Sequence, residues 1–117
     1  MIVVDSSAWL EFLTDGPLAD QFASRLRLSA RVITPAIVVY EVYKHIKRLR
    51  GEDAAIEAVA AMQKTNVISL DQELALLAAD LSLEHKLAMT DAIVLATARQ
   101  YDAKVITSDS DSRDSLA

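Results

Sequence analysis

The sequence opens with Ile2-Val3-Val4-Asp5-Ser6-Ser7-Ala8, where an apolar run passes through polar residues into a second apolar segment. β-Branched residues favour strands, and serine favours the first position of a helix. We therefore expect a strand over residues 1–5 and a helix from Ser7 to Leu13, with Ser6 or Ser7 as its N-cap. Asp5 then ends the strand, at the point where the chain turns into the helix.

The rest of the sequence continues this alternation of strands and helices. Short β-branched runs predict strands at 31–34, 66–70 and 104–107, and helical patterns lie at 18–28, 35–50, 52–64, 71–85 and about 91–101. Asp71 is the expected N-cap of one helix, and Thr90 or Asp91 of the next. The order predicts an α/β fold of three layers, with a central parallel sheet of about four strands flanked by helices. Residues 108–117 are polar and predict a loop or a short helix.

Composition narrows the class of protein. A chain of 117 residues predicts a single domain, 1–117, and the absence of cysteine excludes disulfides, zinc thiolates and a thiol nucleophile. Neither a signal peptide nor a membrane-spanning segment is expected, so we expect a cytoplasmic protein with no membrane partner. The net charge of −5 argues against wholesale nonspecific binding of nucleic acid, although the distribution of charge decides this point.

Four carboxylates lie next to apolar segments, namely Asp5, Glu41, Asp91 and Asp109. Taken singly, each has a structural explanation: a helix cap for Asp5, a first-turn residue for Asp91, a turn for Asp109, and a salt bridge to Lys44 or His45 for Glu41. Ligands of parallel sheets bind outside the carboxyl ends of the strands, where all four residues can meet. Hard oxygen ligands without a histidine pair favour Mg²⁺ or Mn²⁺, and we interpret His45 and His85 as surface residues.

Positive charge gathers in two places, one comprising Arg25, Arg27 and Arg31 and the other Lys44, His45, Lys47, Arg48 and Arg50. Solvated helix faces are the plain explanation of each cluster. Helical spacing nevertheless puts Lys44, His45 and Arg48 on the same side as Glu41. Lys44, Lys47 and Arg48 are candidate contacts for a phosphodiester substrate beside an acidic site. Trp9 and Tyr40 have the shape to stack on a base, but we expect buried packing for both.

Four motifs in this order resemble the PIN-domain nucleases, and most closely the VapC-type toxins of type II toxin–antitoxin systems. The resemblance rests on Ile2–Ala8, Pro35–Val42, Thr90–Ala98 and Ala103–Asp109, and it covers nearly the whole chain. The family usually has an aromatic residue after the fourth motif and a last short strand. Here Ser112 follows Asp111, so either Asp109 or Asp111 can complete the fourth motif.

The resemblance implies an endoribonuclease that uses Mg²⁺ or Mn²⁺ to hydrolyse RNA phosphodiesters, leaving a 5′-phosphate and a 3′-hydroxyl. It assigns Asp5, Glu41 and Asp91 to catalysis and metal binding, with Asp109 as a fourth ligand or water-positioning group. Ser7 and Thr107 would support the site, although a helix cap explains Ser7 equally well. The resemblance also implies a homodimer and a cognate antitoxin that covers the acidic residues.

Two other classes of protein remain as alternatives. The first is a PIN-like binding module without catalysis. The second is a different acidic-site α/β protein, such as a receiver domain or a haloacid-type phosphatase. The second class lacks support in the motifs. The early acidic pair of receiver domains is missing, and Asp5-Ser6-Ser7 does not supply the Asp-x-Asp that the phosphatases need after the first strand.

Overall fold

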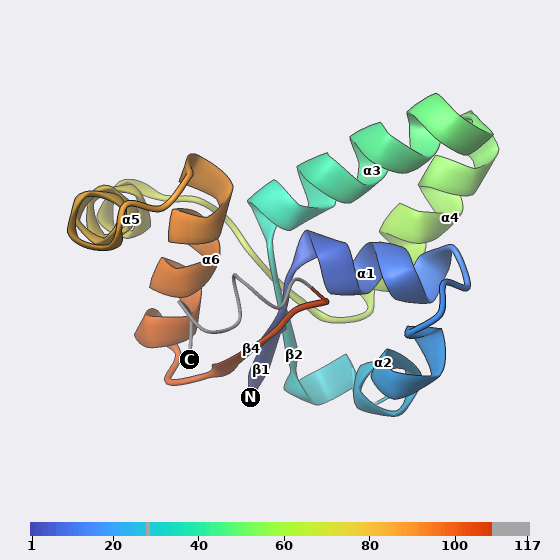
Figure 1. Ribbon diagram of the computed structural model, residues 1–117, viewed down its shortest axis with the longest axis horizontal. Coiled ribbons are helices and arrows are strands. Elements are labelled where there is room, and N and C mark those ends of the chain that lie inside the picture. Colours follow the sequence, from blue (N-terminus) through green and yellow to red (C-terminus); the bar gives the residue numbers. More distant parts are fainter. Residues whose placement is uncertain (28, 109–117) are drawn as a thin grey trace.

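A computed structural model describes residues 1–27 and 29–108 of the chain (Figure 1). Strands and helices alternate along it in the expected order. The elements are β1 (Ile2–Val4), α1 (Ser6–Leu13), α2 (Ala19–Leu26), a 3₁₀ turn (Ser29–Arg31), β2 (Val32–Pro35), α3 (Ala36–Arg50), α4 (Glu52–Gln63), β3 (Asn66–Ile68), α5 (Gln72–His85), α6 (Met89–Gln100) and β4 (Lys104–Ile106). The expected tail element and the residues Asp109, Asp111 and Ser112 lie outside the described residues.

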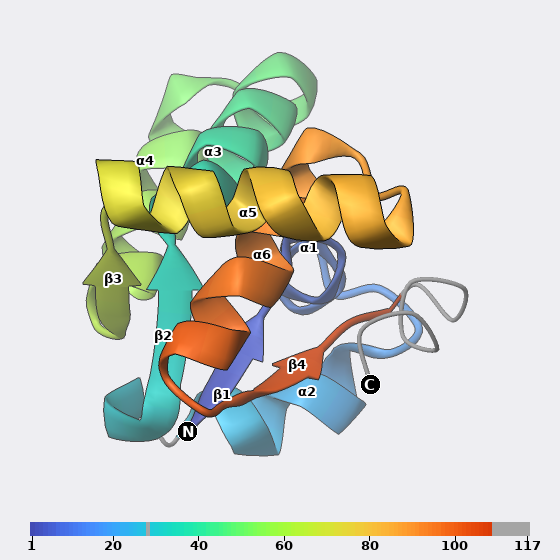
Figure 2. The same ribbon diagram turned by 90° about the vertical axis from the view of Figure 1, so that its left-hand side faces the viewer.

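The four strands form one parallel sheet in the order β3-β2-β1-β4. Val3, in the middle of β1, pairs with Ile33 of β2 and Val105 of β4. Helices α5 and α6 lie on one side of the sheet, and α1, α2 and α4 lie on the other (Figures 1 and 2). This arrangement confirms the predicted α/β/α fold with a central parallel sheet of four strands.

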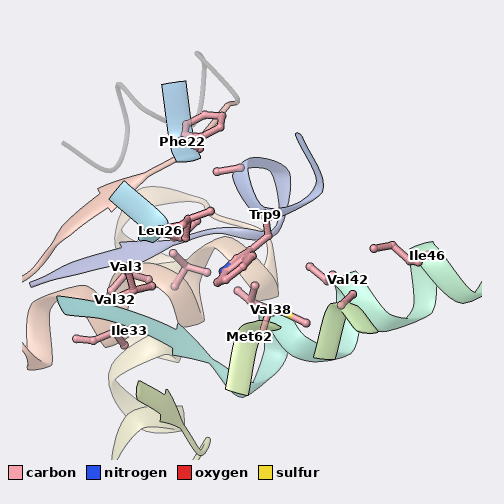
Figure 3. Close-up of a cluster of buried hydrophobic side chains, with 14 of the residues drawn as sticks. Val3, Trp9, Phe22, Leu26, Val32, Ile33, Val38, Val42, Ile46 and Met62 are labelled. Carbon is pink, nitrogen blue, oxygen red and sulfur yellow. The ribbon is translucent and has the colours of Figure 1, made fainter. Parts of the chain in front are cut away.

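The core surrounds β1 and β2, whose central residues are fully buried. Trp9 of α1 packs there with Phe22 and Leu26 of α2 and with Met62 of α4 (Figure 3). A second group of buried residues joins α5 to α6 through Leu74, Leu81 and Ile93, among others. Helix α6 is buried from Ala92 to Ala98 because it lies between the sheet and α5. That burial explains why Ala92–Ala96 is apolar with no helical periodicity.

Two expected helix caps are wrong. The N-cap of α1 is Asp5, whose Oδ1 accepts a hydrogen bond of 3.0 Å from the backbone N–H of Ala8. The strand ends one residue earlier than expected, so the carboxylate rather than a serine hydroxyl faces the free N–H groups. Helix α6 begins at Met89 after Ala88, which makes no side-chain cap, and this places Thr90 and Asp91 inside the first turn. The predicted cap Asp71 is confirmed by its 2.8 Å bond from Leu74 N–H.

Candidate functional site

Asp5 is one of the few buried polar side chains among the described residues, with 7% of its surface exposed. Its Oδ1 accepts hydrogen bonds from the Ala8 N–H and, at 2.7 Å, from the Ser7 hydroxyl. The Ser7 hydroxyl also lies 3.1 Å from the Thr107 hydroxyl and accepts a 3.1 Å bond from the backbone N–H of Ser108. This network fixes one orientation of the Asp5 carboxylate and ties the start of α1 to the chain leaving β4.

Glu41 lies in the second turn of α3 and is half-buried. Its Oε2 accepts a 3.2 Å hydrogen bond from the Thr90 hydroxyl of α6. Its Oε1 is buried and has no hydrogen-bond partner among the described residues. Leaving a buried charged oxygen unpaired costs several kcal/mol, roughly, so this atom requires a cation or a donor that those residues do not supply.

The salt bridge to Lys44 or His45 that would explain Glu41 structurally is not formed within the described residues. The Lys44 ammonium instead donates a 3.3 Å hydrogen bond to the Tyr40 hydroxyl, and Arg48 Nη2 lies 3.4 Å from Nδ1 of His45. Lys44, His45 and Arg48 do share the Glu41 side of α3, as predicted. Together with Tyr40 and Glu41 they line a hollow of about 150 Å³.

Lys47 lies outside this hollow, although it is one of the candidate RNA contacts. Its ammonium donates a 3.3 Å hydrogen bond to the Tyr43 hydroxyl and pairs with Glu52 at 3.6 Å. The hydrogen bond to the Tyr43 hydroxyl and, after it, the nearby Glu52 carboxylate raise the pKa of Lys47 above its usual value.

The two aromatic residues differ. Trp9 is 2% exposed, which confirms buried packing, whereas the same expectation is wrong for Tyr40, which is 56% exposed. The period of α3 explains this difference: Val38 and Val42 face the core and turn Tyr40 outward. Thr90 supports the site, although its sequence position predicted only a helix cap. Its place directly before Asp91 in the third motif was the one sequence feature that could have indicated this role.

The candidate residues lie at one edge of the sheet but do not form a complete metal cage within the described residues. Asp5 follows β1, Thr107 follows β4, and α3 with Glu41 follows β2, so all three leave the carboxyl edge. Asp91 is half-buried in the first turn of α6, next to Thr90. Within 1–27 and 29–108, no group of three His, Cys, Asp or Glu side chains is placed to hold a metal ion.

The chain belongs to the PIN domain family, whose profile matches residues 2–114. Solved structures with the same fold include VapC20 of Mycobacterium tuberculosis, a toxin that cleaves the sarcin-ricin loop. It is 24% identical with a TM-score of 0.81, over 97% of this chain and 94% of that one. A toxin–antitoxin complex from Klebsiella pneumoniae is 24% identical with a TM-score of 0.79, over 93% of this chain and 87% of that one.

A FitAB complex bound to a DNA fragment is also similar, at 20% identity with a TM-score of 0.75, over 99% of this chain and 90% of that one. A comparison with curated proteins finds no match. The family match confirms the resemblance to PIN domains and sets aside the receiver-domain and phosphatase alternatives. The chain shares its fold with VapC-type toxins of known structure.

Proposed function

We propose that this chain is an endoribonuclease toxin of the VapC type, which hydrolyses RNA phosphodiesters at Asp5, Glu41 and Asp91 with the help of Mg²⁺ or Mn²⁺. The proposal rests on the buried Oε1 of Glu41, which has no hydrogen-bond partner among the described residues. A protein that needed Glu41 only for structure would pair that oxygen with one of the cations nearby on α3. Membership in a family of nucleases supports the same conclusion.

The donor set suits a hard divalent cation, since it contains carboxylates and hydroxyls without cysteine. The Glu41 oxygen requires positive charge. Within the described residues, both hydrogen bonds of Asp5 fall on Oδ1, which leaves Oδ2 for a ligand. Asp109, or Asp111 in its place, is the proposed fourth contributor from outside the described residues. When bound, Mg²⁺ or Mn²⁺ supplies Lewis-acid polarisation of the phosphate and activation of water.

The surrounding residues hold the carboxylates in place. Ser7 links Asp5 to Thr107, and Thr90 fixes Glu41 across the gap between α3 and α6. Lys44 and Arg48, which line the hollow beside Glu41, are placed to contact RNA phosphates. Lys47 is the weaker candidate, because its charge is already shared with Glu52.

The first test incubates the purified chain with total cellular RNA and Mn²⁺, with EDTA in a parallel sample. We expect discrete RNA fragments in the sample with Mn²⁺ and none in the sample with EDTA. Intact RNA under all conditions would instead favour the binding module without catalysis. A DNA duplex is included because one similar structure is a complex with DNA.

Removal of the Ser7 hydroxyl is expected to weaken the site without unfolding the chain. In Ser7→Ala, Asp5 keeps its bond from Ala8 but loses the one that fixes its orientation relative to Thr107. Loss of such a supporting contact typically costs ~10–100-fold in metal affinity or activity. Cleavage rate against Mn²⁺ concentration measures this effect. Ser24→Ala, at an exposed position of α2, is the control and should behave like wild type.

A cognate antitoxin is the proposed protein partner, in keeping with the similar toxin–antitoxin complex. An arginine or lysine of that partner would supply the positive charge that Oε1 of Glu41 lacks. The net charge of −5 suits a basic partner segment.

A homodimer is the proposed assembly, and the outer face of α5 and α6 is its proposed contact surface. Leu70 and Met89 are 45% and 68% exposed, and both line an apolar hollow of about 320 Å³ with Ala75 and Ile93, among others. Exposed apolar surface of this kind is typical of protein contacts.

Met89→Glu is expected to shift the protein from dimer to monomer, because a carboxylate would be buried without a partner in that contact. Mass measured by light scattering after size exclusion tests this prediction. Ile56→Glu, at an exposed apolar residue of α4, is the control and should remain dimeric. A wild-type protein that is already monomeric at working concentration would contradict the proposed assembly.

None of the helices in the described part of the chain combines the length and hydropathy needed to cross a bilayer. We propose that residues 1–117 act as one domain in the cytoplasm, where the RNA substrate is found.

A further inference from the structure

We propose that Tyr40 is a stacking platform for an unpaired base of single-stranded RNA, next to the carboxylate of Glu41. The inference rests on the proposed function, since it specifies how the same site selects its substrate. It assigns a role to a side chain that contributes nothing to the core.

The Tyr40 ring is exposed yet held in place. The Lys44 ammonium lies 5.4 Å from the ring centroid and donates to the ring's own hydroxyl at 3.3 Å. Tyr40 and Lys44 are one helical turn apart on α3, so this pair forms without help from another element. The Tyr40 side chain is 56% exposed, so part of the ring surface is accessible to a base. A ring held by this contact loses little conformational freedom when a base stacks on it.

Helix α3 contains a second pair of the same kind, which provides an internal comparison. Tyr43 and Lys47 also lie four residues apart, with the ammonium 5.3 Å from the ring centroid. Tyr43 is half-buried and packs against the core, while Lys47 is paired with Glu52. Core packing explains the Tyr43 pair, whereas the Tyr40 pair faces the hollow that contains Glu41.

The groups around Tyr40 match the chemistry of single-stranded nucleic acid. Proteins that bind single strands combine an aromatic ring for a base with cations that follow the backbone. Lys44, His45 and Arg48 provide basic groups in the same hollow as Tyr40. In an RNA duplex the base faces are already stacked on each other, so an exposed ring gains nothing from them. The hollow is therefore suited to loops and unpaired segments.

The test measures binding rather than cleavage. A fluorescently labelled single-stranded oligoribonucleotide of mixed sequence, and the same strand in a duplex, are titrated with protein in EDTA, where the proposed reaction does not proceed. Tyr40→Ala is expected to weaken binding of the single strand by roughly 5- to 150-fold, the usual effect of losing one stacked base. Tyr40→Phe keeps the ring and should stay within about twofold of wild type. Binding of the duplex should be equally weak in all variants.

Tyr101→Ala serves as the matched control. Tyr101 is another exposed tyrosine, 42% exposed at the end of α6. This variant should bind the single strand like wild type. Lys44→Ala should weaken binding and reduce its salt dependence by about one phosphate contact.

The inference is overturned if Tyr40→Ala binds the single strand as wild type does, if Tyr40→Phe is as weak as Tyr40→Ala, or if wild type binds neither RNA. If wild type cleaves RNA with Mn²⁺ and Tyr40→Ala binds and cleaves RNA just as wild type does, the stacking role fails while the proposed function stands. If wild type shows no cleavage but Tyr40→Ala loses binding, the stacking role stands and the proposed catalysis fails.

Discussion

Asp5→Asn is expected to abolish RNA cleavage while the fold keeps its stability. Asparagine caps a helix about as well as aspartate, so its oxygen can still accept the bonds from Ala8 and Ser7. The substitution removes the negative charge that the proposed cation requires. Metal ions contribute several kcal/mol of transition-state stabilisation, roughly, so the rate should fall by at least about a hundredfold. Single-turnover cleavage and thermal unfolding, measured side by side, test both parts.

Asp71→Asn is the matched control for this experiment. Asp71 is the N-cap of α5 and accepts from Leu74 N–H, as Asp5 accepts from Ala8 N–H, but it lies outside the candidate site. The same chemical change should therefore leave cleavage intact. Equal loss of activity in both variants would show that helix capping, rather than charge at the carboxyl edge of the sheet, explains the effect.

Glu41→Gln is expected to have opposite effects on stability and on the response to metal. In EDTA the variant should be at least as stable as wild type, because it removes a buried charge whose Oε1 has no partner among residues 1–27 and 29–108. With Mn²⁺ at ~100 times its dissociation constant, wild type should gain about 2.7 kcal/mol. That gain corresponds to roughly 10 °C in melting temperature for a domain of this size. The variant should gain far less and should not cleave RNA.

Glu57→Gln, at an exposed position of α4, controls for the loss of one negative charge. It should melt and respond to Mn²⁺ like wild type. Destabilisation of Glu41→Gln by several kcal/mol in EDTA would show instead that the carboxylate has a structural partner.

The order of strands and helices was predictable because each element carries its own local pattern. The helix N-caps were harder to predict. Asp5, Ser6 and Ser7 are all good caps, and only the exact end of β1 decides among them, whereas Asp71 had no competitor. Helix α6 starts at Met89 without any side-chain cap. The polar residues Thr90 and Asp91 therefore predicted a helix start that lies too far along the chain.

The sequence allowed the residues of the candidate site to be named, but it did not allow their hydrogen-bond partners to be predicted. Helical spacing correctly placed Lys44, His45 and Arg48 beside Glu41. It could not show that Lys44 would bond to Tyr40 and leave Glu41 without an ion pair within the described residues, because the choice of partner depends on side-chain rotamers. The bond from Thr90 to Glu41 joins α6 to α3, and no pattern within either helix indicates it.

Mapping of new 5′ ends in RNA treated with the purified chain and Mn²⁺ tests whether Asp5 and Glu41 form a metal-dependent ribonuclease site. Asp5→Asn, Glu41→Gln and an EDTA sample are run beside wild type. We expect discrete ends carrying a 5′-phosphate with wild type and Mn²⁺, and none in the other three samples. Ends that persist in Asp5→Asn, or no new ends with wild type, would contradict a metal-dependent ribonuclease site at these carboxylates.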